Sequence, residues 1–325
     1  MRYGNHRWSR TVRCPILDAM GPLLCLVSAA CFGAMAIFGK FAYDAGVSPG
    51  TLLLIRFTLA AVLLGALLLA RPALRSPLPR GRVLAVAALL GAIGYALQAS
   101  LFFAALQRMD ASLLSLILYT YPALVTVVAA LTGRDRLTRA RGVALVAASA
   151  GTLLVLLGAG AVAFDPLGAL LGFGSAVVYT AYILVSDTVV HRMTPVLLAT
   201  LVMAGAAVTL ALRAALTGGA DLSFRPAGWF WLACIALVST VAAMLTFFAG
   251  LRRTGPATAA ILSTFEPVVT TALAALTLGE FLTPVQLAGG ALVLASVVVL
   301  QLRRPAPLPV REEPIGAPAG SRSSP

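Results

Sequence analysis

The chain has 325 residues, of which 60% are hydrophobic and only 11% are charged, and its formal net charge is +13. A water-soluble protein of this size needs much more charge to cover its surface, so the composition excludes a soluble globular domain. The apolar residues form long blocks, and about 20 such residues in a helix cross a hydrocarbon core of about 30 Å. The sequence therefore predicts an all-α integral membrane protein embedded in a lipid bilayer.

Ten apolar segments follow a basic N-terminal arm at residues 1–20. They predict transmembrane helices at residues 21–43, 50–70, 83–106, 111–132, 142–159, 166–188, 196–217, 228–250, 257–278 and 285–302. Proline directly after a capping residue or glycine favours a helix start, as at Gly21-Pro22, Ser48-Pro49, Asp165-Pro166, Thr194-Pro195, Gly255-Pro256 and Thr283-Pro284. Residues 303–325 are rich in Pro, Gly, Ser and charge and predict a disordered cytoplasmic tail.

The basic residues lie mainly on one side of this predicted bundle. Nineteen of the 24 fall in the arm, the tail and the alternate loops that share their side of the membrane. The positive-inside rule then places both termini in the cytoplasm and the protein in the cell membrane. The net charge is thus a topology signal, and no nucleic-acid partner is expected.

The motifs of several other protein classes are missing from the sequence. It has no phosphate-binding loop for ATP-driven pumping, and its four cysteines and two histidines have no metal-ligand spacing. We therefore expect no cofactor, no metal site and free thiols. No arrangement of serine, histidine and aspartate indicates an enzyme.

An internal repeat divides the chain into two five-helix halves, at residues 21–159 and 166–302. Residues 106–156 align without a gap to residues 251–301, and the alignment pairs Arg108 with Arg253, Pro122 with Pro267, and Thr126 with Thr271. Because five is odd, the second half enters the membrane from the opposite side. Inverted repeats can rock about a central site, so this pattern favours an alternating-access transporter.

Several motifs of these helices also form a family pattern. The first two helices contain "IFGKFAYDAG" and "LLLIRFTLAA", and the ninth contains "STFEPVVTTALAALTLGE". The chain resembles the EamA-like branch of the drug/metabolite transporter superfamily over about residues 20–302. The matching residues are Lys40, Arg56, Glu266, Pro267, Gly279 and Glu280. The chain departs from the pattern at Tyr121-Pro122, where many members carry a second Glu-Pro, and at Arg134-Asp135, which aligns with Gly279-Glu280.

The resemblance implies ten helices, cytoplasmic termini and the transport of small metabolites, often amino acids and often outward. It does not identify the substrate, because members with these motifs carry different compounds.

Glu266 is the first candidate site residue, because a charged group inside an apolar helix is costly and faces the bundle interior or water. It is interpreted as a contact for a substrate amine, a proton site or both, with a structural carboxylate as the alternative. Pro122 and Pro267 occupy equivalent positions and predict kinks, which serve either as hinges around the site or as fixed bends.

Other candidates lie on predicted helix faces. Tyr95 and Gln98 share a face of the third helix, and Tyr179 and Tyr182 share one of the sixth. These residues and Tyr119 either line a substrate cavity or hold helices together. Arg56 needs a partner such as a substrate carboxylate or backbone carbonyls. Lys40 is interpreted as a substrate contact or as a residue that snorkels to the membrane surface.

The sequence thus predicts a secondary transporter, and no enzyme, that exports an amino acid or similar amphipathic solute around a central site near Glu266. Its partners are the solute and the bilayer, with protons as a candidate coupling ion, and both a monomer and a homodimer remain open. Two alternatives are a membrane-embedded enzyme acting on lipid-linked substrates and a scaffold or sensor protein.

Overall fold

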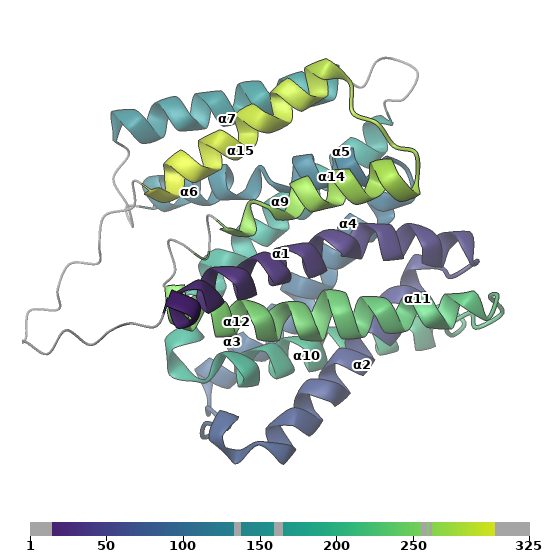
Figure 1. The fold of residues 1–325 in the computed structure, drawn as a ribbon. Helices are drawn as coiled ribbons and strands as arrows, with labels where there is room; N and C mark the ends of the chain where they lie inside the picture. Colours follow the sequence, from purple (N-terminus) through teal and green to yellow (C-terminus); the bar gives the residue numbers. More distant parts are fainter. Residues whose placement is uncertain (1–14, 133–137, 159–164, 255–258, 260–261, 303–325) are drawn as a thin grey trace, which may run out of the picture.

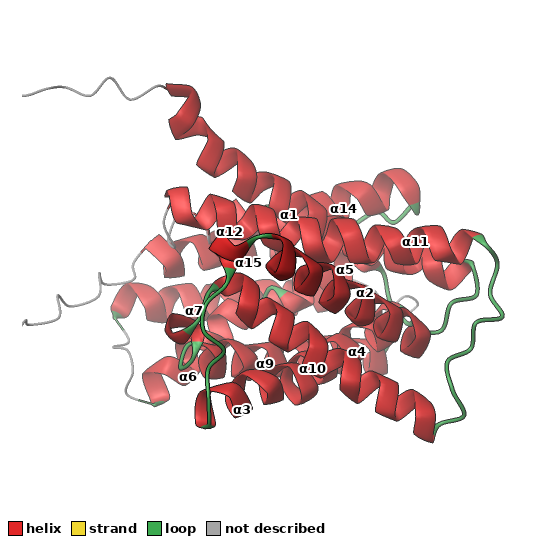
Figure 2. Cartoon of the chain, turned by 90° about the horizontal axis from the view of Figure 1, so that it is seen from below, coloured by secondary structure: helices red, strands yellow, loops and turns green. Residues whose placement is uncertain are grey.

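The computed structural model describes residues 15–132, 138–158, 165–254, 259 and 262–302, and all regular secondary structure in these ranges is helical (Figures 1 and 2). The first half comprises α1 (Pro15–Asp44), α2 (Pro49–Ala70), η1 (Pro72–Leu74), α3 (Arg82–Leu89), η2 (Leu90–Tyr95), α4 (Ala96–Leu106), α5 (Ala111–Leu118), α6 (Tyr121–Leu131) and α7 (Arg139–Leu157). The second comprises α9 (Pro166–Ser186), η3 (Val190–Arg192), α10 (Pro195–Leu216), α11 (Ala227–Ala236), η4 (Leu237–Ala242), α12 (Ala243–Thr254), α14 (Glu266–Thr277) and α15 (Pro284–Leu302).

Seven helical segments in the described residues are long and apolar enough to cross a membrane. They are Met20–Asp44, Pro49–Ala70, Arg82–Leu106, Ala111–Leu131, Pro166–Arg192, Pro195–Leu216 and Ala227–Thr254. Two shorter apolar helices, Gly142–Val155 and Pro284–Val299, lie in two more of the predicted spans. The span predicted at 257–278 falls partly outside the described residues, so ten crossings stay a prediction.

Four of the six predicted helix starts are confirmed, because α2, α9, α10 and α15 begin at Pro49, Pro166, Pro195 and Pro284. The side chain of Ser48 accepts a hydrogen bond from Thr51 N at 3.2 Å, and Thr283 accepts one from Gln286 N at 3.2 Å. Asp165 accepts two N–H bonds of α9, which lower the pKa of its carboxyl. The start predicted at Gly21-Pro22 is wrong, because α1 already begins at Pro15 and contains Pro22. The Gly255-Pro256 start lies outside the described residues.

Four of the predicted helices are interrupted, at matching places in the two halves. The third and eighth each contain a π-helical turn, η2 and η4. The fourth and ninth each break at a turn, after which α6 and α14 begin with a proline in their first turn. π-Turns are rare, and many of those that occur lie at functional sites. The interrupted helices therefore indicate where a functional site is to be sought.

Helix pairs that the repeat makes equivalent run antiparallel. α7 and α15 lie side by side (Figure 1), and a Cβ on Gly151 would lie only 2.7 Å from Gly289 O. Gly158, at the end of α7, approaches Gln286 near the start of α15. α2 and α10 also pack together, and Thr51 at the start of α2 bonds the carbonyl of Asp221, beyond the end of α10. Exchanging the halves also maps the contact of α1 with α12 onto that of α9 with α4.

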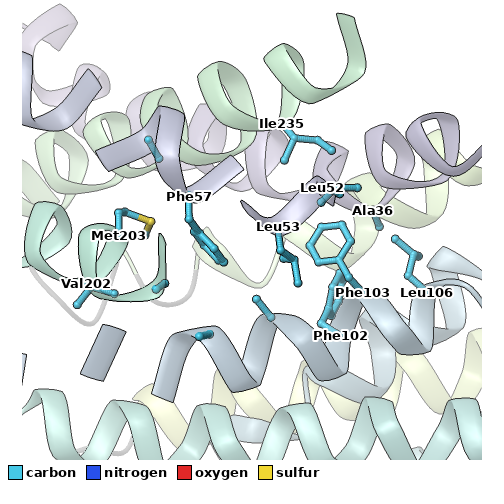
Figure 3. Close-up of a cluster of buried hydrophobic side chains, with 14 of the residues drawn as sticks. Ala36, Leu52, Leu53, Phe57, Phe102, Phe103, Leu106, Val202, Met203 and Ile235 are labelled. Carbon is cyan, nitrogen blue, oxygen red and sulfur yellow. The ribbon is translucent and has the colours of Figure 1, made fainter. Parts of the chain in front are cut away.

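A buried apolar core lies where α2, α4 and α10 meet (Figure 3). Phe57 of α2, Phe103 of α4 and Met203 of α10 are each at most 1% exposed. Residues from both halves therefore share one core. This core borders the polar residues of the candidate site.

Candidate functional site

The break before α14 leaves a backbone carbonyl without its helical partner. Pro267 has no N–H, so the carbonyl of Ser263, four residues earlier, cannot form the usual α-helical bond with it. The hydroxyl of Tyr119, from the end of α5, approaches this carbonyl oxygen at 2.5 Å and Oε2 of Glu266 at 3.0 Å. A residue of the first half thus compensates for the break in the second half and contacts its carboxylate.

The backbone of Glu266 is held against α1. The hydroxyl of Thr270 lies within hydrogen-bonding distance of two backbone carbonyl oxygens, that of Gly33 at 3.0 Å and that of Glu266 at 3.1 Å. A Cβ on Gly33 would lie 2.8 Å from the carbonyl oxygen of Glu266, so α1 approaches this turn at backbone contact distance. These contacts fix the turn that presents the carboxylate.

Five tyrosines continue from Glu266 into the bundle, and we call them the tyrosine path. Their successive ring centroids lie 5.7 Å apart from Tyr119 to Tyr121, 4.7 Å from Tyr121 to Tyr179, 5.9 Å from Tyr179 to Tyr182 and 5.5 Å from Tyr182 to Tyr95. These separations lie within the range of favourable ring contacts. The path draws on both halves of the chain and offers an amphipathic wall of rings with hydroxyls.

Arg56 lies at the far end of the tyrosine path. Its side chain is 1% exposed, its Nη2 is 3.5 Å from the hydroxyl of Tyr95, and its Nε donates to Thr240 at 3.0 Å. Its guanidinium carbon lies 5.0 Å from the ring centroid of Phe57 and 5.6 Å from that of Phe103. These contacts place a cation against ring faces, which is favourable when the cation is desolvated.

Two predicted substrate contacts have other described partners. Gln98 is buried and donates from its side-chain amide to Ser175 of α9 at 3.0 Å, while Ser175 donates back to the Gln98 carbonyl at 3.1 Å. Lys40 lies 3.9 Å from Oε1 of Glu280. The structure therefore gives Gln98 an interhelical contact and Lys40 an ion pair, and their role in substrate binding stays a prediction.

The Lys40–Glu280 pair belongs to a cluster that joins three parts of the bundle. Oε2 of Glu280, in the connection from α14 to α15, accepts the N–H of Ser112 at 3.3 Å, at the start of α5. Burial raises the pKa of Glu280, and the nearby charge of Asp110 raises it further, while Lys40 and backbone N–H groups act in the opposite direction. We call Lys40, Glu280 and Ser112 the Glu280 latch.

Sequence reasoning missed several of these contacts. Tyr121 is the position that the repeat aligns with Glu266, so the alignment itself contained its signal. Thr240 lies inside η4, where a π-turn shifts the helical register, and α-helical spacing gave no sign of its contact with Arg56. Glu280 matched the family pattern but was not counted as a site residue.

A surface cavity of about 410 Å³ lies elsewhere, between the start of α2, the end of α4 and the end of α10. Its lining includes Ser48, Gln107 and Arg213 but neither Glu266 nor Arg56. We do not assign it to the site, because it lacks the buried charges and the tyrosines.

Comparisons with known proteins identify a family and a similar fold. A family model described as the EamA-like transporter family matches residues 19–157 and again residues 166–302. The uncharacterized transporter YcbK of Bacillus subtilis (strain 168) is 30% identical over 281 residues, which cover 83% of this chain and 89% of that protein. A chain of known crystal structure has a TM-score of 0.61 and 22% identity, with 87% of this chain and 97% of that chain covered, and this likeness concerns the fold.

Proposed function

Because the chain belongs to the EamA-like transporter family, we propose that it exports an amino acid or similar amphipathic solute by alternating access around Glu266 and the tyrosine path. The observation that carries this proposal is the contact between Glu266, at a broken helix of the second half, and Tyr119, at the equivalent break of the first half. A solute bound there touches both halves, so relative movement of the halves changes which side it faces.

The packing of equivalent helices supports the inverted arrangement of these halves. The antiparallel contacts of α7 with α15 and of α2 with α10 are those expected when one repeat is turned over relative to the other. The matching breaks and π-turns lie inside their apolar helices and not at the helix ends, which supports a site near the bilayer midplane, where such transporters bind their substrates. We further propose that both termini face the cytoplasm, as the basic residues indicate.

The hydrogen bonds of Tyr119 support a proton site at Glu266. The hydroxyl has one hydrogen but lies within bonding distance of two acceptors, the Ser263 carbonyl oxygen and the Glu266 carboxylate. A protonated Glu266 supplies the second hydrogen, since its O–H can donate to the tyrosine oxygen while the tyrosine donates to the carbonyl. Release of this proton would break that arrangement, which couples proton movement to the site.

The Glu280 latch supports a conformation that is closed at one end. It joins α1, α5 and the α14–α15 connection at the end that the proposed topology places outside the cytoplasm. When the site opens to that side these three segments must separate, so the latch has to break and re-form in each transport cycle. Export is the direction that the family resemblance implies.

The test is transport by the purified protein in proteoliposomes, with radiolabelled amino acids and an imposed pH gradient. We expect counterflow of at least one amino acid by the wild type and at least about a hundredfold loss in Glu266→Gln, since that variant lacks the ionisable group. Asp221→Asn is the matched control, because it neutralises an exposed carboxylate in a loop. Normal transport by Glu266→Gln at every pH would refute the role of this carboxylate.

A further inference from the structure

Arg56 is a buried cation without a described acidic partner. It is 1% exposed, and neither of the two ion pairs among the described residues involves it. A buried charge is costly unless a counter-charge and hydrogen bonds compensate for it. The arrangement therefore lacks a negative group that would complete it.

The neutral partners of Arg56 use only part of its hydrogen-bonding capacity. A guanidinium has five N–H donors, and the described bonds of Arg56 are those of Nε with Thr240 and of Nη2 with Tyr95. Thr240 donates its own hydroxyl to the carbonyl of Ile235 at 3.0 Å. Nη1 makes no hydrogen bond to a described residue, so the planar fork keeps donors for an oxyanion.

The fold does not require a cation at this position. The helix starts at Pro49 and Pro195 align Arg56 of α2 with Val202 of α10. Val202 is 1% exposed, and its backbone packs against Gly91 of η2, where a Cβ would lie only 2.1 Å from the Val202 carbonyl oxygen. An apolar residue thus occupies the equivalent position in the other half, so helix packing at this position does not require the charge of Arg56.

The position of Arg56 relative to the tyrosine path indicates the ligand. Tyr95, its hydrogen-bonding partner, is the last ring of the path that starts beside Glu266. A solute that lies along these rings reaches the carboxylate at one end of the path and the guanidinium at the other. The two hydroxyls that accept hydrogen bonds from the guanidinium belong to Tyr95 of η2 and Thr240 of η4.

We propose that Arg56 is the subsite for a carboxylate of the transported solute, which replaces the Tyr95 and Thr240 hydroxyls during the transport cycle. A carboxylate fits the planar fork of the guanidinium through two parallel hydrogen bonds. A doubly charged phosphate fits the same fork, but Arg56 would compensate only one of its two negative charges. This proposal rests on the proposed transport function and specifies which solutes the site accepts.

The test compares each amino acid with its methyl ester, which keeps the amine and side chain but lacks the carboxylate charge. Binding to the wild type in detergent is measured by thermal shift over the twenty proteinogenic amino acids, and then by calorimetry for each pair that binds. We expect the ester to bind about 10–150-fold more weakly than the acid, as for loss of a hydrogen bond to a charged group. Arg56→Gln should remove this difference, and Arg56→Lys should restore part of it.

Glu266→Gln is the control variant, because it should weaken the acid and its ester equally. Equal affinities of acid and ester for the wild type would overturn the subsite, and this comparison holds even if Arg56→Gln does not fold. If the affinities of acid and ester are equal but the wild type still transports the same amino acids in proteoliposomes, the proposed function stands and only the subsite is overturned. If the wild type neither binds nor transports any amino acid or ester, both proposals fail.

Discussion

η2 and η4 occupy the same place in the two halves, but their neighbours differ in kind. At η2, Gly91 allows the backbone of Val202 to approach at contact distance, which makes a tight apolar junction. At η4, the hydroxyl of Thr240 instead accepts a hydrogen bond from Nε of Arg56. The repeated backbone therefore carries one junction built for packing and one that holds a charge.

The fourth and ninth helices show the same division. Both break before a proline, but the position that is Glu266 in the ninth helix is Tyr121 in the fourth. The first half thus contributes the cation and three of the five rings, and the second half contributes the carboxylate and the other two rings. In the proposed transport cycle, the similar backbones of the two halves are the moving parts, and their different side chains give the proposed site two distinct ends.

The largest expected effect comes from exchanging the residue types at the two junctions. Val202→Arg should lower the free energy of unfolding by about 3–5 kcal/mol, because it buries a charge with no partner against η2. Arg56→Met should not lower it and can raise it by about 1–4 kcal/mol, since an apolar side chain of similar length replaces a buried charge. Thermal and denaturant unfolding in one detergent measures both.

A large loss of stability in Arg56→Met, with an unchanged Val202→Arg, would contradict this assignment of roles. It would make Arg56 a structural residue and the η2 junction the adaptable one.

The tight junction itself is tested by Gly91→Ala. The added Cβ meets backbone atoms of Val202, which cannot rotate away, so we expect a loss of about 1–3 kcal/mol of unfolding free energy. Gly65→Ala is the matched control in α2, because a Cβ there meets no other atom within 4 Å. The control should be neutral or stabilising by up to about 1 kcal/mol. Equal behaviour of the two variants would show that η2 and α10 can separate at no cost.

The contact between the two breaks is tested by Tyr119→Phe. Loss of the hydroxyl leaves the Ser263 carbonyl without this partner, and we expect a cost of about 1–2 kcal/mol in unfolding free energy together with impaired transport. Tyr182→Phe, on the same path, keeps the ring contacts and removes a hydroxyl with no described hydrogen bond. If both variants lose the same stability, the hydroxyl of Tyr119 does not compensate for the break.

The smallest expected effect concerns the pH dependence of two carboxylates. The pKa of Glu280 is raised, so its contribution to stability is present below its ordinary value of 4.5 and is lost as the pH rises through the raised native value. Because Glu280 is partly exposed, we expect less than about 1 kcal/mol. Glu280→Gln should remove this component from the pH profile of the unfolding midpoint.

Asp165 gives the opposite sign and serves as the comparison. The pKa of Asp165 is lowered by the N–H groups of its own helix, so its contribution is present above its ordinary value of 3.8 and is lost at lower pH. If the unfolding midpoint of Glu280→Gln parallels that of the wild type at every pH, Glu280 does not contribute to the pH dependence of stability.

Local signals predicted much of this architecture. Prolines after capping residues located the starts of α2, α9, α10 and α15, and the aligned Pro122 and Pro267 located both breaks. The spacing of Tyr179 and Tyr182 predicted a shared face, because both lie in the regular helix α9. Thr194 shows the limit of such signals, since its hydroxyl donates to the Leu74 carbonyl and makes no capping bond.

Contacts between distant segments could not be predicted in this way. A π-turn adds a residue to one turn and rotates everything after it, so α-helical spacing could not place Thr240 opposite Arg56. The pairing of Lys40 with Glu280 depends on how α1 meets the α14–α15 connection, which no local pattern specifies. The sequence predicted the charged residues themselves, and the packing decides their partners.

The close contact of Gly151 with Gly289 has a consequence for the origin of the chain. The repeat alignment pairs these glycines with Ser296 and Ala144, which are also small and buried, so the surface that joins α7 to α15 is self-complementary. Two copies of an unfused five-helix ancestor could associate through such an isologous surface in opposite orientations. In that ancestor every substitution appears twice, whereas gene fusion allows one half to carry an arginine and the other a glutamate at positions that are not equivalent.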